Sequence, residues 1–229
     1  MRVCVLFSGG KDSTFALWYA IHQAHDVSCV LTLLPERLNS WMFHFPAVEW
    51  TSLQAKALGV PQVTAKTSGV KEQELGALKE ALSGLAATHG IDCVVTGGIA
   101  SEYQKSRVDR ICDDLRIRSV SPFWGLSPGR LLAEEIGLGF EFIVTACTAM
   151  GLDRSWLGRV IDSEALEELR SIGKRHGINL AFEGGEAETF VTDAPIFKKR
   201  IRIVEAEPVW KGDSGYLSIT RAELVEKFT

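Results

Sequence analysis

A glycine-rich loop close to the N-terminus carries residue types that bind phosphate. It reads SGGKDS over residues 8–13 and directly follows the apolar run RVCVLF. Glycines let the backbone curl and present several N–H groups to an anion, and a helix that begins there adds the positive end of its dipole. The lysine can neutralise phosphate charge, while the aspartate can hold Mg²⁺ or cap the helix. The candidate phosphate-binding residues are Ser8, Gly9, Gly10, Lys11, Asp12 and Ser13.

Two familiar nucleotide-binding motifs do not fit this loop. A Walker loop needs a glycine five positions before its Gly-Lys pair and Ser or Thr after the lysine, but Val5 and Asp12 occupy those positions. The dinucleotide pattern GxGxxG is absent as well. A turn that joins a strand to a helix without any ligand is the structural alternative. It is disfavoured because a strand, SGGxDS and a helix follow one another in register.

A second glycine pair begins the segment GGIASEYQKSRVDRIC at residues 97–112, after another apolar run. In a parallel sheet the ends of both runs meet at one edge, where ligands bind. The alternative is a plain helix capped by Ser101 with solvated cations. In the ligand-binding interpretation, Gly97 and Gly98 let the backbone approach a ligand closely, and Tyr103, Gln104 and Arg107 supply polar and cationic groups at the start of the next helix.

The segment FEGGEAETFVTDAP at residues 182–195 concentrates acidic side chains. Three glutamates within six residues, bent by a glycine pair, suit metal binding, general-base catalysis or recognition of a cationic substrate. An acidic surface loop is the equally weighted alternative. The glutamates are Glu183, Glu186 and Glu188.

An aromatic segment, WMFHFPAVEW, spans residues 41–50. Aromatic side chains at this density usually form core, and a lone histidine is more often structural than catalytic. A loop position near the other motifs makes packing against adenine or the substrate the competing interpretation, for which Trp41 and His44 are the candidates.

The elements that position these motifs alternate between strand and helix patterns. Expected strands at 2–7, 27–34, 61–67 and 91–98 alternate with helices at 14–24, 48–59, 71–89 and 104–115. This alternation predicts an α/β fold with a doubly wound parallel sheet.

Beyond residue 122 the alternation loosens. Helices are expected near 130–136 and 163–176, the latter capped by Ser163, with strands at 140–147, 201–210 and 216–219 and a short helix after Thr220. The sequence GDSG at 212–215 is expected to be a hairpin turn. We therefore predict two domains, one at 1–121 that carries the glycine-rich loop and a smaller C-terminal α+β subdomain at 122–229 that carries the acidic segment and packs on the first.

Composition narrows the class of protein. The 229 residues are 46% hydrophobic and 24% charged, as in ordinary globular proteins, and the net charge of -4 provides no positive field for nucleic acid. Five scattered cysteines predict reduced core thiols. The apolar run VCVLF is too short for a signal peptide or a membrane span, so a cytoplasmic protein without a membrane partner is expected.

Taken together, the motifs resemble the diphthine-ammonia ligases and their archaeal relatives, a subgroup of the PP-loop ATP pyrophosphatases. SGGKDS, SWMFH, the pattern G-x-x-S-x-Y-Q-x-x-R-V from Gly98 to Val108, and EGGEAET followed by DAP occur in the family's order across almost the whole chain. One departure is Ala187, where many relatives carry an aromatic residue.

The resemblance implies a ligase that uses ATP and Mg²⁺ to convert diphthine on elongation factor 2 to diphthamide with ammonia, through an acyl adenylate. AMP and pyrophosphate leave. A homodimer is left open. Two alternatives remain: a PP-loop enzyme that adenylates another substrate such as a tRNA base, and a non-catalytic ATP-binding module.

The implied catalytic residues are Lys11, Asp12 and Glu186, with Asp12 as the metal ligand. The implied substrate-binding residues are Trp41, His44, Tyr103, Gln104, Arg107, Glu183, Gly184, Gly185, Glu186, Glu188 and Thr189.

Overall fold

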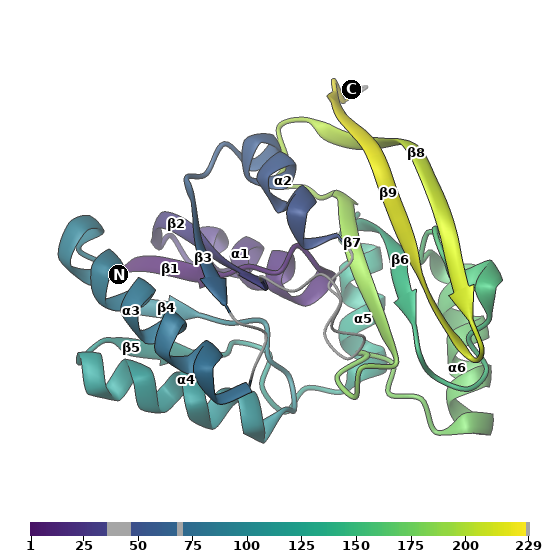
Figure 1. The fold of residues 1–229 in the computed structure, drawn as a ribbon, viewed down its shortest axis with the longest axis horizontal. Helices are drawn as coiled ribbons and strands as arrows, with labels where there is room; N and C mark the ends of the chain where they lie inside the picture. Colours follow the sequence, from purple (N-terminus) through teal and green to yellow (C-terminus); the bar gives the residue numbers. More distant parts are fainter. Residues whose placement is uncertain (36–46, 68–70, 228–229) are drawn as a thin grey trace. The chain divides into compact units, whose positions relative to one another are not determined.

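The computed structural model describes residues 1–35, 47–67 and 71–227 (Figure 1). Contacts divide them into two compact units. The first falls within Met1–Ser8, Asp12–His44 and Val60–Trp124, and the second within Gly9–Lys11, Phe45–Gly59 and Gly125–Thr229.

The first unit is built on a five-stranded sheet in the order β3-β2-β1-β4-β5, in which every neighbouring pair is parallel. Its strands are β1 (Arg2–Leu6), β2 (Asp26–Pro35), β3 (Gln62–Thr67), β4 (Cys93–Val95) and β5 (Arg118–Val120). The strand order reverses between β1 and β4, which is where ligands bind in sheets of this kind. The predicted doubly wound parallel sheet is confirmed.

Helices α1 (Lys11–His22), α3 (Lys71–His89) and α4 (Glu102–Leu115) connect these strands. Figure 1 shows α3 and α4 side by side, and their apolar stripes share one core with the sheet. Leu82 of α3 and Cys112 of α4 pack in the same cluster as Cys4 of β1. Val3 and Val5 point to the opposite face of β1 and are equally buried, so this strand is covered on both faces, as its apolar run predicts.

The five cysteine side chains are buried and free, in agreement with the predicted core thiols. Burial and the nearby Asp109 carboxylate raise the pKa of Cys112 to about 12. Burial raises the pKa of Cys147 to about 12 as well, with a smaller contribution from Asp153. Both thiols are therefore protonated at neutral pH, which makes them poor nucleophiles.

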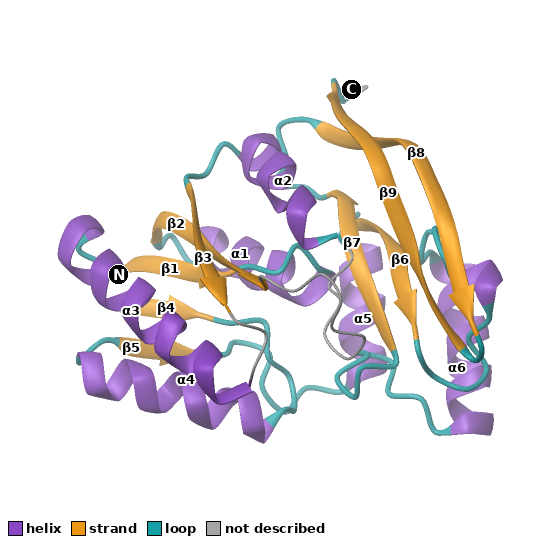
Figure 2. Ribbon diagram, viewed as in Figure 1, coloured by secondary structure: helices purple, strands orange, loops and turns teal. Residues whose placement is uncertain are grey.

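The second unit contains a four-stranded antiparallel sheet in the order β7-β6-β9-β8 (Figure 2). Its strands are β6 (Glu141–Cys147), β7 (Ala187–Asp193), β8 (Arg200–Lys211) and β9 (Ser214–Val225). The helices of this unit are α2 (Thr51–Leu58), α5 (Pro128–Gly137) and α6 (Ser163–His176), with short 3-10 turns at Val48–Trp50 and Arg154–Trp156.

Strands β8 and β9 form a hairpin that corrects one prediction. The expected short helix after Thr220 is wrong, because β9 runs on to Val225 and pairs with the start of β8. Glu223 lies opposite Arg202 and accepts a hydrogen bond from its Nε at 2.9 Å. The predicted hairpin turn is confirmed, with Gly212 at a φ of 61° as the first of its two residues.

The caps of two helices are well defined. Gly59 ends α2 in the left-handed conformation, at a φ of 71°. Helix α6 begins at Ser163 as predicted, but the cap is Asp162, whose Oδ1 accepts the Ala165 N–H at 2.8 Å.

Among the described residues, no helix combines the length and the apolar character needed to cross a bilayer.

Candidate functional site

The first unit places the loop after β1 against the loop after β4. The Ser8 N–H donates to Ser13 Oγ at 3.3 Å, and the two hydroxyl oxygens lie 3.2 Å apart. A Cβ on Gly97 would stand 2.6 Å from the carbonyl carbon and oxygen of Asp12 and 2.7 Å from the Ser13 nitrogen. Gly97 is therefore what allows the second glycine motif to lie directly on the first turn of α1. The structure brings these two predicted motifs together.

The polar residues after the second glycine pair lie at the start of α4. The cap expected at Ser101 is present, since its Oγ accepts the Gln104 N–H at 3.4 Å. Tyr103 is 42% exposed, and the Arg107 guanidinium carbon lies 3.4 Å from the centroid of its ring. Arg107 also donates to the Tyr103 carbonyl at 3.2 Å. The two side chains therefore stack on each other, with Gln104 exposed beside them.

Gly9, Gly10 and Lys11 belong by their contacts to the second unit, where they line the outer edge of β7. The Val191 N–H donates to the Gly9 carbonyl at 3.0 Å, and the Lys11 N–H donates to Thr189 Oγ1 at 3.2 Å. Gly9 has a φ of 82°, which favours glycine strongly. The predicted phosphate loop is thus hydrogen-bonded to β7, the strand that lies within the acidic segment.

The side chain of Lys11 also contacts residues 181 and 182, at the start of the acidic segment. It is 1% exposed, its Nζ donates to the Ala181 carbonyl at 3.0 Å, and the ammonium lies 5.8 Å from the centroid of the Phe182 ring. A buried ammonium needs such partners, because desolvation is costly. Phe182 has a φ of 64°, a strained conformation for an aromatic residue and one of the kind that clusters at functional sites.

The acidic segment is a tight turn held by one of its own glutamates. Glu186 Oε1 accepts the Asn179 N–H at 3.0 Å, and Oε2 accepts the Gly184 N–H at 2.9 Å. From the end of β6, the Thr148 N–H donates to the Glu186 carbonyl at 2.9 Å, and the Thr148 hydroxyl donates to the carbonyl of Gly185. Glu186 therefore shapes the turn, while Glu183 and Glu188 flank it, both partly exposed.

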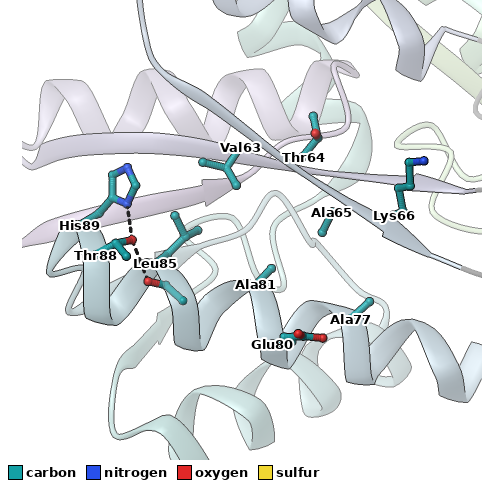
Figure 3. Close-up of a pocket in the computed structure, with 11 residues that line it drawn as sticks. Val63, Thr64, Ala65, Lys66, Ala77, Glu80, Ala81, Leu85, Thr88 and His89 are labelled. Atoms are coloured by element: carbon teal, nitrogen blue, oxygen red, sulfur yellow. Dashed lines mark hydrogen bonds between the residues drawn. The ribbon is translucent and has the colours of Figure 1, made fainter.

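The first unit contains two surface hollows. The hollow of about 410 Å³ in Figure 3 is formed by β3 and α3, where Val63 and Ala65 face Ala81 and Leu85, and it contains none of the predicted site residues. The second, of about 450 Å³, lies along α3 and α4 and includes Arg107.

Some predicted residues are not placed, and one residue that contacts the phosphate loop was not predicted. Trp41 and His44 lie outside the described residues. Gln54 of α2 was not predicted, yet its amide contacts both the Gly9 and Val191 carbonyls. The sequence contains only one signal that could have identified Gln54: it is a long polar side chain on a helix face whose other residues are mostly small or apolar.

Comparison with known proteins bears on the whole chain. Residues 1–119 match the family model of the diphthamide synthase N-terminal domain, and residues 127–225 match that of the diphthamide synthase C-terminal domain. Among solved structures, a predicted subunit of tRNA methyltransferase from Methanocaldococcus jannaschii aligns with a TM-score of 0.41 and 17% identity, over 85% of this chain and 99% of that one. A likeness this weak supports no argument.

The curated relatives are named diphthine–ammonia ligase. The mouse protein is 30% identical, covering 99% of this chain and 94% of its own length, and the zebrafish protein is 29% identical, covering 99% and 98%. The Schizosaccharomyces pombe protein is 30% identical over 96% of this chain, which spans 39% of that longer relative. On these matches, the chain belongs to the diphthamide synthase family, the family of the diphthine–ammonia ligases.

Proposed function

We propose that this chain is an ATP-dependent diphthine–ammonia ligase acting on elongation factor 2. One observation besides family membership carries the proposal: the loop Gly9–Lys11 is hydrogen-bonded to β7 and to the turn at residues 181–186. An ATP phosphate held by this loop would lie beside the acidic segment. A ligase that activates a carboxylate needs this proximity, because the carboxylate must reach the α phosphate.

The proposed chemistry runs in two steps. A carboxylate oxygen of diphthine attacks the α phosphorus of ATP, which forms an O–P bond and expels pyrophosphate. Ammonia then attacks the acyl carbon, AMP leaves with the bonding electrons, and the nitrogen loses a proton to give the neutral amide. Adenylation is required because ammonia cannot displace oxide from a carboxylate, whereas AMP is a good leaving group.

The loop after β1 supplies the groups for phosphate binding in this proposal. Its backbone N–H groups and the N-terminus of α1 attract anions, and the hydroxyls of Ser8 and Ser13 lie at the same end of the helix. To meet a phosphate, the Lys11 ammonium would exchange its hydrogen bond to Ala181 for one to the nucleotide. Gly10, Gly97 and Gly98 complete the proposed nucleotide site within residues 1–121.

The donor groups at this loop also fit Mg²⁺. No cluster of three or more His, Cys, Asp or Glu side chains suited to a metal occurs in the described part of the chain. Mg²⁺ does not require one, because it binds through one or two carboxylates together with substrate phosphates. Asp12, in the first turn of α1, would hold the ion, which would neutralise charge on the departing pyrophosphate.

The acidic turn and β7 form the proposed substrate site within residues 122–229. Diphthine carries a trimethylammonium group, which carboxylates and aromatic faces can bind. Glu183, Glu186 and Glu188 are the carboxylates proposed to contact the cation, and Glu186 also holds its own turn. The other residues proposed to contact the substrate are Gly184, Gly185 and Thr189 in this segment, together with residues of the N-terminal part of the chain: Trp41, His44, Tyr103, Gln104 and Arg107.

The decisive experiment measures nucleotide products. The chain is incubated with ATP, Mg²⁺ and ammonium, with and without elongation factor 2 that carries diphthine. We expect AMP and pyrophosphate only when that protein is present, together with its conversion to the amide. ATP that is bound but stays intact under these conditions would contradict the proposal and favour a non-catalytic ATP-binding module. AMP formed only with tRNA would favour the other alternative, which the names of the curated relatives do not support.

We also propose a cytoplasmic location, for which the free buried thiols are typical. A homodimer stays a prediction, and sedimentation of the purified protein measures it.

A further inference from the structure

Gln54 of α2 has the contacts of a residue that positions the site. Its side chain is fully buried, and its amide nitrogen donates two hydrogen bonds of 2.8 Å, one to the Gly9 carbonyl and one to the Val191 carbonyl. Both amide hydrogens are thus used, which also fixes which way the carboxamide faces. One side chain joins the phosphate loop to the strand that follows the acidic turn.

The side chain of Gln54 also lies directly against the loop. A Cβ on Gly9 would stand 2.3 Å from Gln54 Oε1 and 2.9 Å from Thr51 Cγ2, so α2 packs directly on the Gly9 backbone. Gln54 Oε1 accepts no hydrogen bond from any residue that the structure describes. A buried oxygen without a donor is costly, and it is tolerated here while the amide nitrogen satisfies two backbone carbonyls.

We infer that Gln54 is a positioning residue of the ligase: its amide holds the Gly9 carbonyl and the Val191 carbonyl together, so that the phosphate loop is in its binding conformation at the edge of β7. The inference rests on the proposed function in so far as the loop binds ATP. It does not depend on the identity of the protein substrate.

Two variants separate positioning from general stability. Gln54→Met keeps the length and apolar stem of the side chain and removes both donors. Thr51→Val is the matched control, because Thr51 is 1% exposed on the same helix, its hydroxyl donates to the Val48 carbonyl at 2.6 Å, and valine can keep the methyl that meets Gly9. Each variant loses buried hydrogen bonding on α2, but only Gln54→Met releases the phosphate loop.

The measurements are the dissociation constant for MgATP by calorimetry, KM for ATP, and the thermal midpoint, all on the full chain. We expect Gln54→Met to weaken ATP binding about tenfold, as when a loop loses a hydrogen bond of ordinary strength. KM for ATP should rise in parallel. Thr51→Val should lower the thermal midpoint and leave ATP affinity unchanged, since a smaller folded fraction reduces kcat but not KM.

The inference is overturned if Gln54→Met binds ATP as the wild type does, or if Thr51→Val weakens binding to the same extent. Should Gln54→Met fail to fold, Gln54→Asn, whose amide is one carbon too short to reach both carbonyls, replaces it with the same expectation. A wild-type chain that does not bind MgATP would instead contradict the proposed function, so the two failures are distinguishable.

Discussion

Two glycine pairs look alike in the sequence and differ in what the fold requires of them. Gly97, which follows β4, is needed for space, because a Cβ there would meet the backbone of Asp12 and Ser13 at 2.6–2.7 Å. Gly185, in the acidic turn, has open space on its side-chain side: apart from its chain neighbours, no described atom would lie within 4 Å of a Cβ there. Its φ, however, is 81°. The first glycine is therefore constrained by packing and the second by its backbone conformation.

Gly98 and Gly184, the other glycines of the two pairs, differ as well. A Cβ on Gly98 would find only Thr96 Oγ1 at 3.7 Å among the described atoms, an ordinary contact, whereas a Cβ on Gly184 would meet the Glu186 carboxylate at 2.8 Å. Backbone atoms cannot yield to an added methyl group, but a side-chain carboxylate can turn away. The comparison teaches that a glycine pair in this family must be interpreted residue by residue.

Gly97→Ala should have the largest effect. The added methyl group must push apart the backbone of two loops, so we expect a loss of about 3 kcal/mol in the free energy of unfolding, at the upper end of overpacking penalties. ATP binding should fall with it, because the first turn of α1 moves. Urea unfolding and calorimetry measure both. A loss below about 1 kcal/mol would show that the two loops are not in rigid contact.

Glu186→Gln comes next, because the carboxylate accepts two backbone N–H groups that shape the turn. An amide can accept only one of them, and its own N–H₂ then faces the other donor. We expect a loss of about 1.5 kcal/mol in stability and a lower kcat, with ATP affinity retained. Loss of ATP binding in this variant would show that the turn belongs to the nucleotide site.

Gly185→Ala should cost about 1–2 kcal/mol, the penalty for a left-handed alanine. Because the surroundings are open, no packing penalty adds to it. Thermal unfolding of Gly185→Ala and of Gly97→Ala, measured under the same conditions, shows whether backbone conformation or packing constrains the glycine more strongly. An equal or larger loss for Gly185→Ala would reverse the ranking of the two pairs.

Gly98→Ala should have the smallest effect on folding, within about 0.5 kcal/mol of the wild type, because neither its φ nor its surroundings require glycine. This variant therefore tests the proposed contact between Gly98 and the nucleotide separately from any effect on folding. If Gly98 lies against the nucleotide, as proposed, ATP affinity falls while the unfolding curve stays in place. Unchanged affinity would remove Gly98 from the nucleotide site.

The sequence predicts four of the five strands of the parallel sheet, and β1 and β4 are the clearest because they are apolar runs that end near glycine. Strand β5 was not predicted, because its three residues, RSV, form no apolar run. The end of the β8–β9 hairpin was harder to predict from the sequence. Residues 220–223 read TRAE, which resembles a helix-capping pattern, but Glu223 lies across from Arg202 and the pairing of β9 with β8 overrides the local preference. Long-range pairing of this kind leaves no local signal.

The candidate site was predictable in its motifs and not in its internal contacts. SGGKDS and EGGEAET stand out by composition, yet nothing in them indicates that Lys11 donates to the Ala181 carbonyl or that Glu186 is engaged by its own turn. Gln54 could not be identified, because a glutamine on a helix is ordinary until the backbone that it contacts is known.

The distance along the chain between the contacting residues has a consequence for synthesis. The hydrogen bonds from Lys11 reach residues 170 and 178 positions further along the chain. At 5–20 residues per second, the phosphate loop leaves the ribosome roughly 10–40 s before β7 does. During that time the loop lacks the strand edge on which it lies in the finished protein. A nascent chain arrested before residue 187 should therefore contain the parallel strands but no complete site.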